Sequence, residues 1–131
     1  MRILIVEDNQ TVGRTLRRRM ERRGHEAVWV ESGEAALERL ADGTWRADRY
    51  VLDLRLPGMS RVELLDRLLK LEPPVAAGQL FVVSVGAEQH RVELEARRVP
   101  SGQILQKGTY SEGELLVALR LVDPPRGQGS D

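Results

Sequence analysis

The chain of 131 residues has no cysteine and no long apolar stretch. The missing thiols exclude zinc-thiolate sites, thiol nucleophiles and disulfide frameworks, and they are compatible with a reducing compartment. The apolar run at residues 3–6 is too short for a signal peptide, and no later run is long enough to span a bilayer. We therefore expect a soluble cytoplasmic protein that is not inserted in a membrane.

Net charge is also missing, because 20 Lys and Arg residues balance 20 Asp and Glu residues. This balance argues against a protein whose main activity is to bind nucleic acid or an anionic membrane. No glycine fingerprint follows the first apolar run, so dinucleotide binding is disfavoured. A chain of 131 residues has the size of one domain, which buries a core without a disulfide or a structural metal.

Short apolar runs alternate with helical patterns along the chain. Runs at residues 2–6, 25–30, 50–52, 80–83 and 104–106 predict strands, and the segments between and after them predict helices. Ser32 and Ser60 are typical helix starts, and Gly24 is a typical helix end. Five strands alternating with five helices indicate an α/β fold, with a parallel sheet covered on both faces, over residues 1–122. Residues 123–131 predict a disordered tail or a linker stub.

The last two predicted helices differ in their apolar content. The segment from Ala87 to Arg97 has only Val92, Leu94 and Ala96 as apolar contacts, so we expect a weakly anchored helix. The final helix is expected to begin near residue 111 and to bury the side chains of Leu115, Leu119 and Val122.

Polar residues close four of the predicted strands. Right-handed crossovers bring the carboxyl ends of parallel strands to one edge of the sheet, where such folds bind ligands. A carboxylate inside an apolar strand also requires something that offsets its charge. We therefore expect the polar residues at these ends to share one site: Glu7, Asp8, Asp53, Ser84 and Lys107.

Three of these groups are carboxylates, which repel one another when they are crowded. Oxygen ligands without histidine or cysteine favour Mg²⁺, and Ca²⁺ or Mn²⁺ less. A hydroxyl and an ammonium group beside such a cation suit a phosphoryl group. A central carboxylate can act as a nucleophile and form an acyl phosphate, and Asp53 is the best placed to do so.

These residues resemble the receiver domain of two-component response regulators. The resemblance rests on Glu-Asp-Asn at residues 7–9, on Asp53 followed by Leu-Pro-Gly-Met at residues 56–59, and on Ser84 and Lys107 in the expected order. It covers residues 2 to about 122. It implies a single flavodoxin-like domain with strand order 2-1-3-4-5.

The resemblance also implies roles for individual residues. Asp53 is expected to accept a phosphoryl group from the phosphohistidine of a sensor histidine kinase or a phosphotransfer protein. Asp8 and Asp53 are expected to bind Mg²⁺ directly, Glu7 through a water molecule and Arg55 through its backbone carbonyl. The domain is thus expected to be regulatory, with self-catalysed phosphotransfer and slow autodephosphorylation as its only chemistry.

Ser84 and Lys107 are expected, by the same resemblance, to contact the phosphoryl group. Ser84 and Ile104 are the expected switch residues. Phosphorylation is expected to alter the face formed by the fourth helix, the fifth strand and the last helix. That face then binds an unknown downstream protein or a second copy of the chain.

The chain departs from the family pattern at three positions. Val85 stands where receivers have a small residue, and Ile104 stands where they usually carry an aromatic switch residue. Gly108 replaces a proline that is normally preceded by a cis bond. Because a cis bond without proline costs about 3–4 kcal/mol, we predict a trans Lys107–Gly108 peptide.

Two other functions therefore stay open. The first is a degenerate receiver that binds partners without being phosphorylated, which the three departures favour. The second is a small Mg²⁺-dependent phosphatase with Asp53 as its nucleophile. Arg55 weighs against the phosphatase, since it occupies the position where a general acid is needed. Labelling with a phosphodonor and Mg²⁺ separates these possibilities.

Two further features have plain interpretations. The arginines at positions 14, 17, 18, 19, 22 and 23 predict a solvated helix face, with docking of a kinase's phosphotransfer helices as the less favoured alternative. Trp29 and Trp45 are expected to be packing residues.

Overall fold

The computed structural model describes residues 1–53, 59–84, 90–106 and 112–119, in which strands and helices alternate as the sequence predicts. The strands are β1 (Arg2–Val6), β2 (Glu26–Val30), β3 (Arg49–Asp53), β4 (Leu80–Ser84) and β5 (Ile104–Gln106). The helices are α1 (Gln10–Arg22), α2 (Gly33–Leu40), α3 (Arg61–Leu69), α4 (Arg91–Ala96) and α5 (Glu112–Ala118). Two short 3-10 turns, which the sequence did not predict, precede β4 and β5: η1 (Ala77–Gln79) and η3 (Ser101–Gln103).

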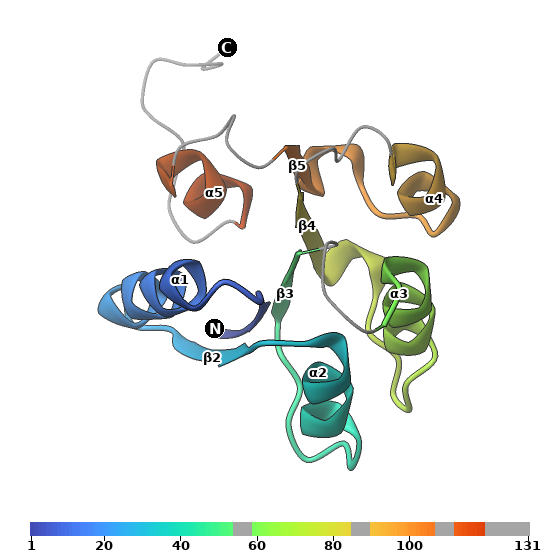
Figure 1. The fold of residues 1–131 in the computed structure, drawn as a ribbon, viewed down its shortest axis with the longest axis horizontal. Coiled ribbons are helices and arrows are strands. Elements are labelled where there is room, and N and C mark those ends of the chain that lie inside the picture. The colour runs from blue at the N-terminus through green and yellow to red at the C-terminus, as the bar shows by residue number, and fades with distance from the viewer. Residues whose placement is uncertain (54–58, 85–89, 107–111, 120–131) are drawn as a thin grey trace.

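The described strands form one parallel sheet in the order β2-β1-β3-β4-β5, which confirms the predicted order. Helices α1 and α5 cover one face, and α2, α3 and α4 cover the other (Figure 1). A sheet covered on both faces requires continuously apolar strands. Strand β1 meets this requirement, because Ile3, Leu4 and Ile5 are fully buried. The predicted α/β class and flavodoxin-like fold are therefore confirmed.

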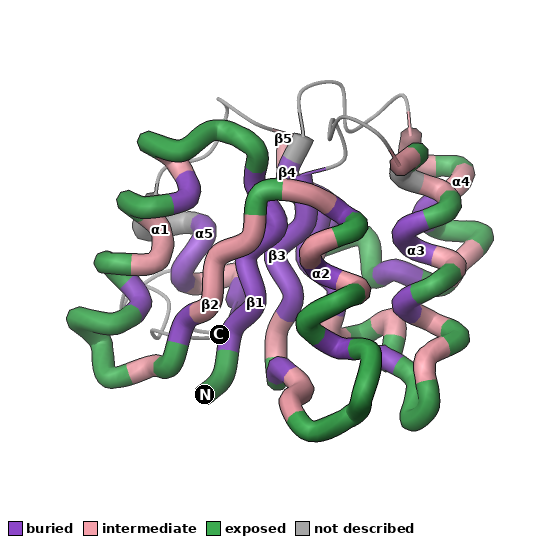
Figure 2. Tube along the Cα trace, turned by 60° about the horizontal axis from the view of Figure 1, so that its bottom comes forward, coloured by how far each residue is buried: buried purple, intermediate pink, exposed green. Residues whose placement is uncertain are grey.

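The apolar side chains form two buried clusters, one on each face of the sheet. One cluster joins the strands to Leu40 of α2, Leu65 of α3 and Leu94 of α4. The other joins them to Met20 of α1 and to Leu119, just after α5. Buried residues lie along the central strands and the inward sides of the helices (Figure 2). Since burying one such side chain contributes about 1.5–3 kcal/mol, the two clusters supply the main driving force for folding.

Side-chain caps start three of the helices. The side-chain oxygens of Asn9, Ser32 and Ser60 accept hydrogen bonds of 3.0, 3.0 and 3.1 Å from the backbone N–H three residues further on. These bonds satisfy N–H groups that have no partner inside the first turn of a helix. At the other end of α1, Gly24 has a φ of +88°, which glycine adopts without steric cost. The predicted helix boundaries at Ser32, Ser60 and Gly24 are thus confirmed.

Helix α4 is weakly anchored, as predicted, but it has fewer apolar contacts than expected. Only one of its three predicted apolar contacts is buried, namely Leu94, whereas Val92 is 79% exposed and Ala96 is exposed. The contacts predicted for Val92 and Ala96 were wrong because successive helical residues are about 100° apart around the axis. Positions two residues apart therefore point to nearly opposite sides, and Val92 and Ala96 cannot share the inward side with Leu94.

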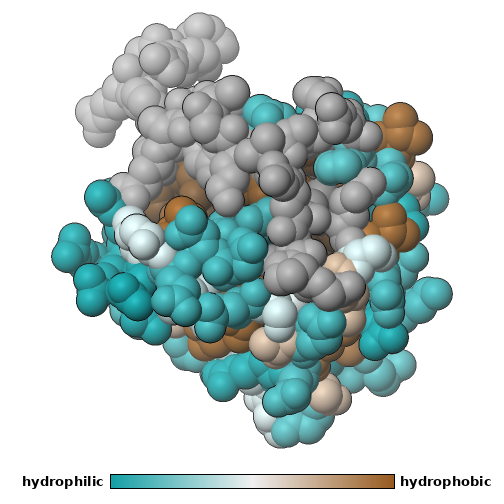
Figure 3. Space-filling model, in the orientation of Figure 1, coloured by the Kyte–Doolittle hydropathy of each residue, from teal (hydrophilic) through white to brown (hydrophobic). Residues whose placement is uncertain are grey.

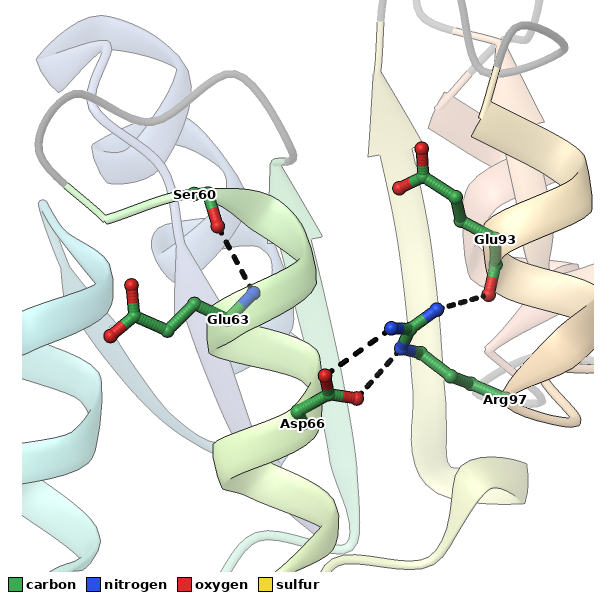
Figure 4. A network of polar contacts seen from close by, with 5 residues as sticks. All are labelled: Ser60, Glu63, Asp66, Glu93 and Arg97. Carbon is green, nitrogen blue, oxygen red and sulfur yellow. Dashed lines mark hydrogen bonds and ion pairs between the residues drawn. The ribbon is translucent and has the colours of Figure 1, made fainter.

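An ion pair links the end of α4 to α3 (Figure 4). The guanidinium of Arg97 donates from Nε to Oδ1 of Asp66 at 2.7 Å and from Nη2 to Oδ2 at 3.2 Å. Its Nη1 donates to the backbone carbonyl of Glu93 at 2.9 Å. This forked geometry is the favoured arrangement for a guanidinium and a carboxylate. The pair supplements the single buried side chain of α4.

The outward side of α1 is hydrophilic, as Figure 3 shows at the position of this helix. Arg17 is half-buried there. The exposed arginines, which confirm the predicted solvated helix face, are Arg14, Arg18, Arg19, Arg22 and Arg23. No helix among the described residues combines the length and the apolar character needed to cross a membrane.

Candidate functional site

Three carboxylates meet at the carboxyl end of the sheet. Glu7 and Asp8 follow β1 directly, and Asp53 is the last residue of β3. One oxygen of each carboxylate lies within 4.8 Å of the others. Strands β1 and β3 are parallel neighbours in which Val6 lies opposite Leu52, so the residues that follow them emerge side by side. The structure thus brings together the three acidic residues that the sequence assigned to one site.

Burial makes this cluster unusual. The side chain of Glu7 is 4% exposed and that of Asp53 is 5% exposed, whereas Asp8 is exposed. Among the side chains that the structure describes, no other charged group is buried. Removing a carboxylate from water costs several kcal/mol unless its charge is compensated. A compensating positive charge is therefore expected close to Glu7 and Asp53.

Three hydrogen bonds hold the turn between β1 and α1 that carries two of the acids. The backbone N–H of Glu7 donates to the carbonyl of Val30 at 3.0 Å, which extends the pairing of β1 with β2. The backbone N–H of Asn9 donates to Oε2 of Glu7 at 3.1 Å, and Oδ1 of Asn9 accepts from the N–H of Val12. The Glu7 carboxylate is thereby tied to the start of α1.

The donor atoms of this cluster fit a hard divalent cation. They are all carboxylate oxygens, they lie near enough to one another to share one ion, and one carboxylate reaches solvent while two are buried. Mg²⁺ and Ca²⁺ prefer such oxygen ligands, and Mg²⁺ usually keeps several water molecules. The exposed side of Asp8 leaves room for that water.

Several predicted positions lie outside the described residues. Ser84 ends β4, as predicted, but its side chain is not among those described. The predicted site residues Arg55 and Lys107 belong to ranges that are not described, and so do Val85 and Gly108 with the predicted trans peptide.

Ile104, the residue at the expected aromatic switch position, opens β5 and is 6% exposed. It belongs to the same buried cluster as Leu94 of α4 and Val82 of β4. This side chain therefore points into the core beneath α4, and not toward solvent.

The sequence interpretation missed one contact to the site. Trp29 of β2 was expected to be a packing residue, and its ring does pack against the cluster on the α1 face. Its indole Nε1–H also donates to the backbone carbonyl of Glu7 at 2.9 Å. No local pattern in the sequence indicates this bond, because the two residues are 22 positions apart.

Comparison with known families matches this arrangement. The family described as response regulator receiver domain matches residues 3–120, which is nearly all of the chain. The matched range includes all four strand ends from which the predicted site residues come.

Individual relatives agree with that match. The transcriptional activator protein IrlR of Burkholderia pseudomallei is 41% identical over 68 residues, which are 52% of this chain and 29% of that protein. The sensory/regulatory protein RpfC of Xanthomonas campestris pv. campestris is 31% identical over 68 residues, 52% of this chain and 9% of that protein. The matched regions thus span less than a third of either relative. The non-phosphorylated HemR receiver domain of Leptospira biflexa is similar in structure, with a TM-score of 0.75 and 27% identity over 95% of this chain and 96% of that one.

Proposed function

Because the chain belongs to the response regulator receiver domain family, we propose that it is a phosphoacceptor switch in a two-component pathway. Asp53 accepts a phosphoryl group from the phosphohistidine of a sensor histidine kinase or a phosphotransfer protein. The observation that carries the proposal is the burial of Asp53 and Glu7, with Asp8 beside them, at the carboxyl end of the sheet.

Charge repulsion supports a cation at this position. Carboxylate oxygens of Glu7 and Asp53 separated by 4.8 Å or less repel by about 3.5 kcal/mol or more at an effective dielectric constant of about 20. Glu7, Asp8 and Asp53 hold Mg²⁺ and so relieve this repulsion. When it is bound, Mg²⁺ offsets the negative charge of the carboxylates and of the incoming phosphoryl group.

The chemical step uses Asp53 as a nucleophile. One of its carboxylate oxygens attacks phosphorus, a P–O bond forms as the P–N bond to the donor imidazole breaks, and the released imidazole nitrogen takes up a proton. The product is an acyl phosphate. The position of Asp53 at the end of a paired, buried strand orients the attacking oxygen before the donor arrives.

Further contacts follow from the family pattern. Ser84 and Lys107 bind the oxygens of the phosphoryl group, and the backbone carbonyl of Arg55 completes the cation site. Phosphorylation then alters the face formed by α4, β5 and α5, which binds the downstream protein. The shortness of α4 and its single buried apolar residue, Leu94, support this face as the one that changes.

Phosphodonor labelling tests the proposal. Incubation with acetyl phosphate and Mg²⁺ is expected to add one phosphoryl group, observed by intact-mass spectrometry and removed by hydroxylamine, which cleaves acyl phosphates. Asp53→Asn should abolish the addition. Asp48→Asn is a matched control, because Asp48 is an exposed aspartate that precedes the same strand at its opposite end.

The outcomes are distinct. Wild-type protein that stays unlabelled with Mg²⁺ and donor present would defeat the proposal, as would labelling that persists in the Asp53→Asn protein. Glu7→Gln and Asp8→Asn should slow labelling without moving it to another residue. Repeated turnover of a phosphate ester, with no stable adduct, would instead establish a phosphatase.

One observation favours a second candidate, a degenerate receiver that binds its partners without phosphorylation. Ile104 is packed into the core and has no hydroxyl, so it cannot form a hydrogen bond with Ser84 in the way an aromatic hydroxyl does. Hydrogen–deuterium exchange with and without beryllofluoride, a phosphoryl mimic, separates the two candidates. The phosphoacceptor switch predicts altered exchange in α4 and β5, and the degenerate receiver predicts unchanged exchange.

A further inference from the structure

Trp29 is placed between the core and the acidic cluster. It lies in β2, one residue before the end of the strand, and its ring packs with Leu16 of α1 against the buried cluster of that face. At the same time its indole N–H donates to the carbonyl oxygen of Glu7 at 2.9 Å. One side chain thus contacts both the apolar core and the backbone of a carboxylate residue in the site.

The structure makes specific room for this ring. Gly13 of α1 is buried, and a Cβ atom at this position would lie 2.7 Å from Cδ1 of Trp29 and nearer still to Nε1 and Cε2. Real Cβ atoms do not make contacts this short, so the indole rests directly on the helix backbone. The atom that a side chain here would displace, Nε1, is the one that reaches Glu7.

Both peptide groups of Glu7 are consequently held by the end of β2. Its N–H donates to the carbonyl of Val30, and its carbonyl accepts from Trp29. The carboxylate is fixed separately through the N–H of Asn9. With its backbone held at both sides, the Glu7 side chain has few ways to leave the cluster.

We propose that Trp29 is a positioning residue for the cation site, because its indole N–H fixes the backbone of Glu7. This inference rests on the proposed function, in which Glu7 helps to hold Mg²⁺. Groups that orient metal ligands commonly change metal affinity by 10- to 100-fold when they are removed. Trp29 acts on the backbone of one ligand residue, so an effect of about tenfold is expected.

The chain offers a matched control in its other tryptophan. Trp45 donates from Nε1 to Oε2 of Glu26 at 2.8 Å, and its ring lies 5.1 Å from the guanidinium of Arg39. Glu26 begins β2, whereas Trp29 lies near its end. Trp45 therefore has comparable polar contacts at the opposite end of the same strand.

Mg²⁺ titration by calorimetry tests the proposal in the wild type, in Trp29→Phe and in Trp45→Phe. Phenylalanine keeps an aromatic ring at position 29 but has no N–H donor. The dissociation constant for Mg²⁺ is expected to rise about tenfold in Trp29→Phe and to stay unchanged in Trp45→Phe. Because the chain has 2 tryptophans, the Trp45→Phe protein also reports the emission of Trp29 alone.

The emission maximum of Trp29 should shift when Mg²⁺ is added, because the cation binds Glu7, whose backbone carbonyl accepts the indole hydrogen bond. The emission of Trp45 in the Trp29→Phe protein should not shift. This optical readout leaves Trp29 intact, so it decides the question even if Trp29→Phe folds poorly. The positioning role would be overturned if a folded Trp29→Phe protein bound Mg²⁺ as tightly as the wild type, or if Mg²⁺ binding left the emission of Trp29 unchanged. Neither result would contradict the proposed function. Absence of Mg²⁺ binding by the wild type would overturn the proposed function itself.

Discussion

Replacing Gly13 by alanine should either raise or lower the free energy of unfolding, depending on the contact between position 13 and the ring of Trp29. In an open helical position, alanine stabilises a protein by about 0.5–1 kcal/mol relative to glycine. Gly13 is in the first half of α1 and has an ordinary helical backbone, so helix propensity alone predicts a gain. The Trp29 indole predicts the opposite, because the new Cβ would overlap its ring.

The expected change in the free energy of unfolding follows from the displacement of the Trp29 indole. Displacing the indole loses its hydrogen bond to the Glu7 carbonyl, worth about 0.5–1.5 kcal/mol, and strains a packed core, which costs about 1–3 kcal/mol. After subtraction of the propensity gain, Gly13→Ala should lower the free energy of unfolding by about 0.5–4 kcal/mol. Urea denaturation followed by circular dichroism measures this difference.

A second background separates the clash from any other effect. In a Trp29→Ala protein the ring is gone, so adding Gly13→Ala should now raise the free energy of unfolding by about 0.5–1 kcal/mol. Gly33→Ala is the control in the wild-type background, because a Cβ at Gly33 would meet Sδ of Met59 at 3.4 Å, an ordinary contact. If Gly13→Ala stabilises the wild type, or has the same effect in both backgrounds, the assigned contact between Gly13 and Trp29 is wrong.

Two further predictions concern α4 and its ion pair. Leu94→Ala should destabilise the protein by about 2–5 kcal/mol, because it leaves a cavity at a buried position. Val92→Ala, at a position that is 79% exposed, should change the free energy of unfolding by less than about 0.5 kcal/mol. Urea denaturation compares the two variants, and equal losses of stability would contradict the placement of α4. Hydrogen bonds from Arg97 lower the pKa of Asp66 below its usual 3.8, so the ion pair contributes stability that is present above about pH 4 and is lost as the pH falls through the lowered pKa. The melting temperatures of wild type and Asp66→Asn should therefore differ at neutral pH and converge below about pH 4, and a constant difference down to pH 2 would refute the assignment.

The parallel sheet and the acidic cluster were predictable because they depend on the spacing of apolar residues and on topology, whereas the order of the strands was predicted from the resemblance to receiver domains. Apolar runs such as residues 2–6 have to be covered on both faces, and parallel strands have to end at a common edge. Once Glu7 and Asp53 are placed at the ends of two such strands, their proximity needs no knowledge of side-chain packing. The helix at α4 was also predicted, but two of its three predicted apolar contacts were wrong, since Val92, Leu94 and Ala96 have a spacing that suits a strand and not a helix.

The 3-10 turns η1 and η3 were not predictable because long-range side-chain bonds support them. Nε2 of Gln103 donates to the carbonyls of Gly78 and Leu80 at 3.1 and 2.8 Å, which joins the approach to β5 to the approach to β4. Nε2 of Gln79 similarly donates to the carbonyls of Ala47 and Asp48, both at 3.4 Å and more than 30 positions away. A glutamine carries no local signal for such bonds, since they form only after neighbouring strands have paired.

The contact of Trp29 with Gly13 and Glu7 shows how packing and chemistry are coupled in this fold. A tryptophan in a strand is expected from sequence patterns to be a packing residue, and the ring of Trp29 does pack against the buried cluster. Its N–H needs a hydrogen-bond partner when the ring is half-buried, however, and the sequence does not indicate which group that partner is. Here the partner is the backbone of Glu7, so we expect a change that shifts α1 against the sheet to shift a residue of the acidic cluster as well. A helix-to-strand contact outside the cluster, between Gly13 and Trp29, is therefore expected to influence the geometry of the cluster.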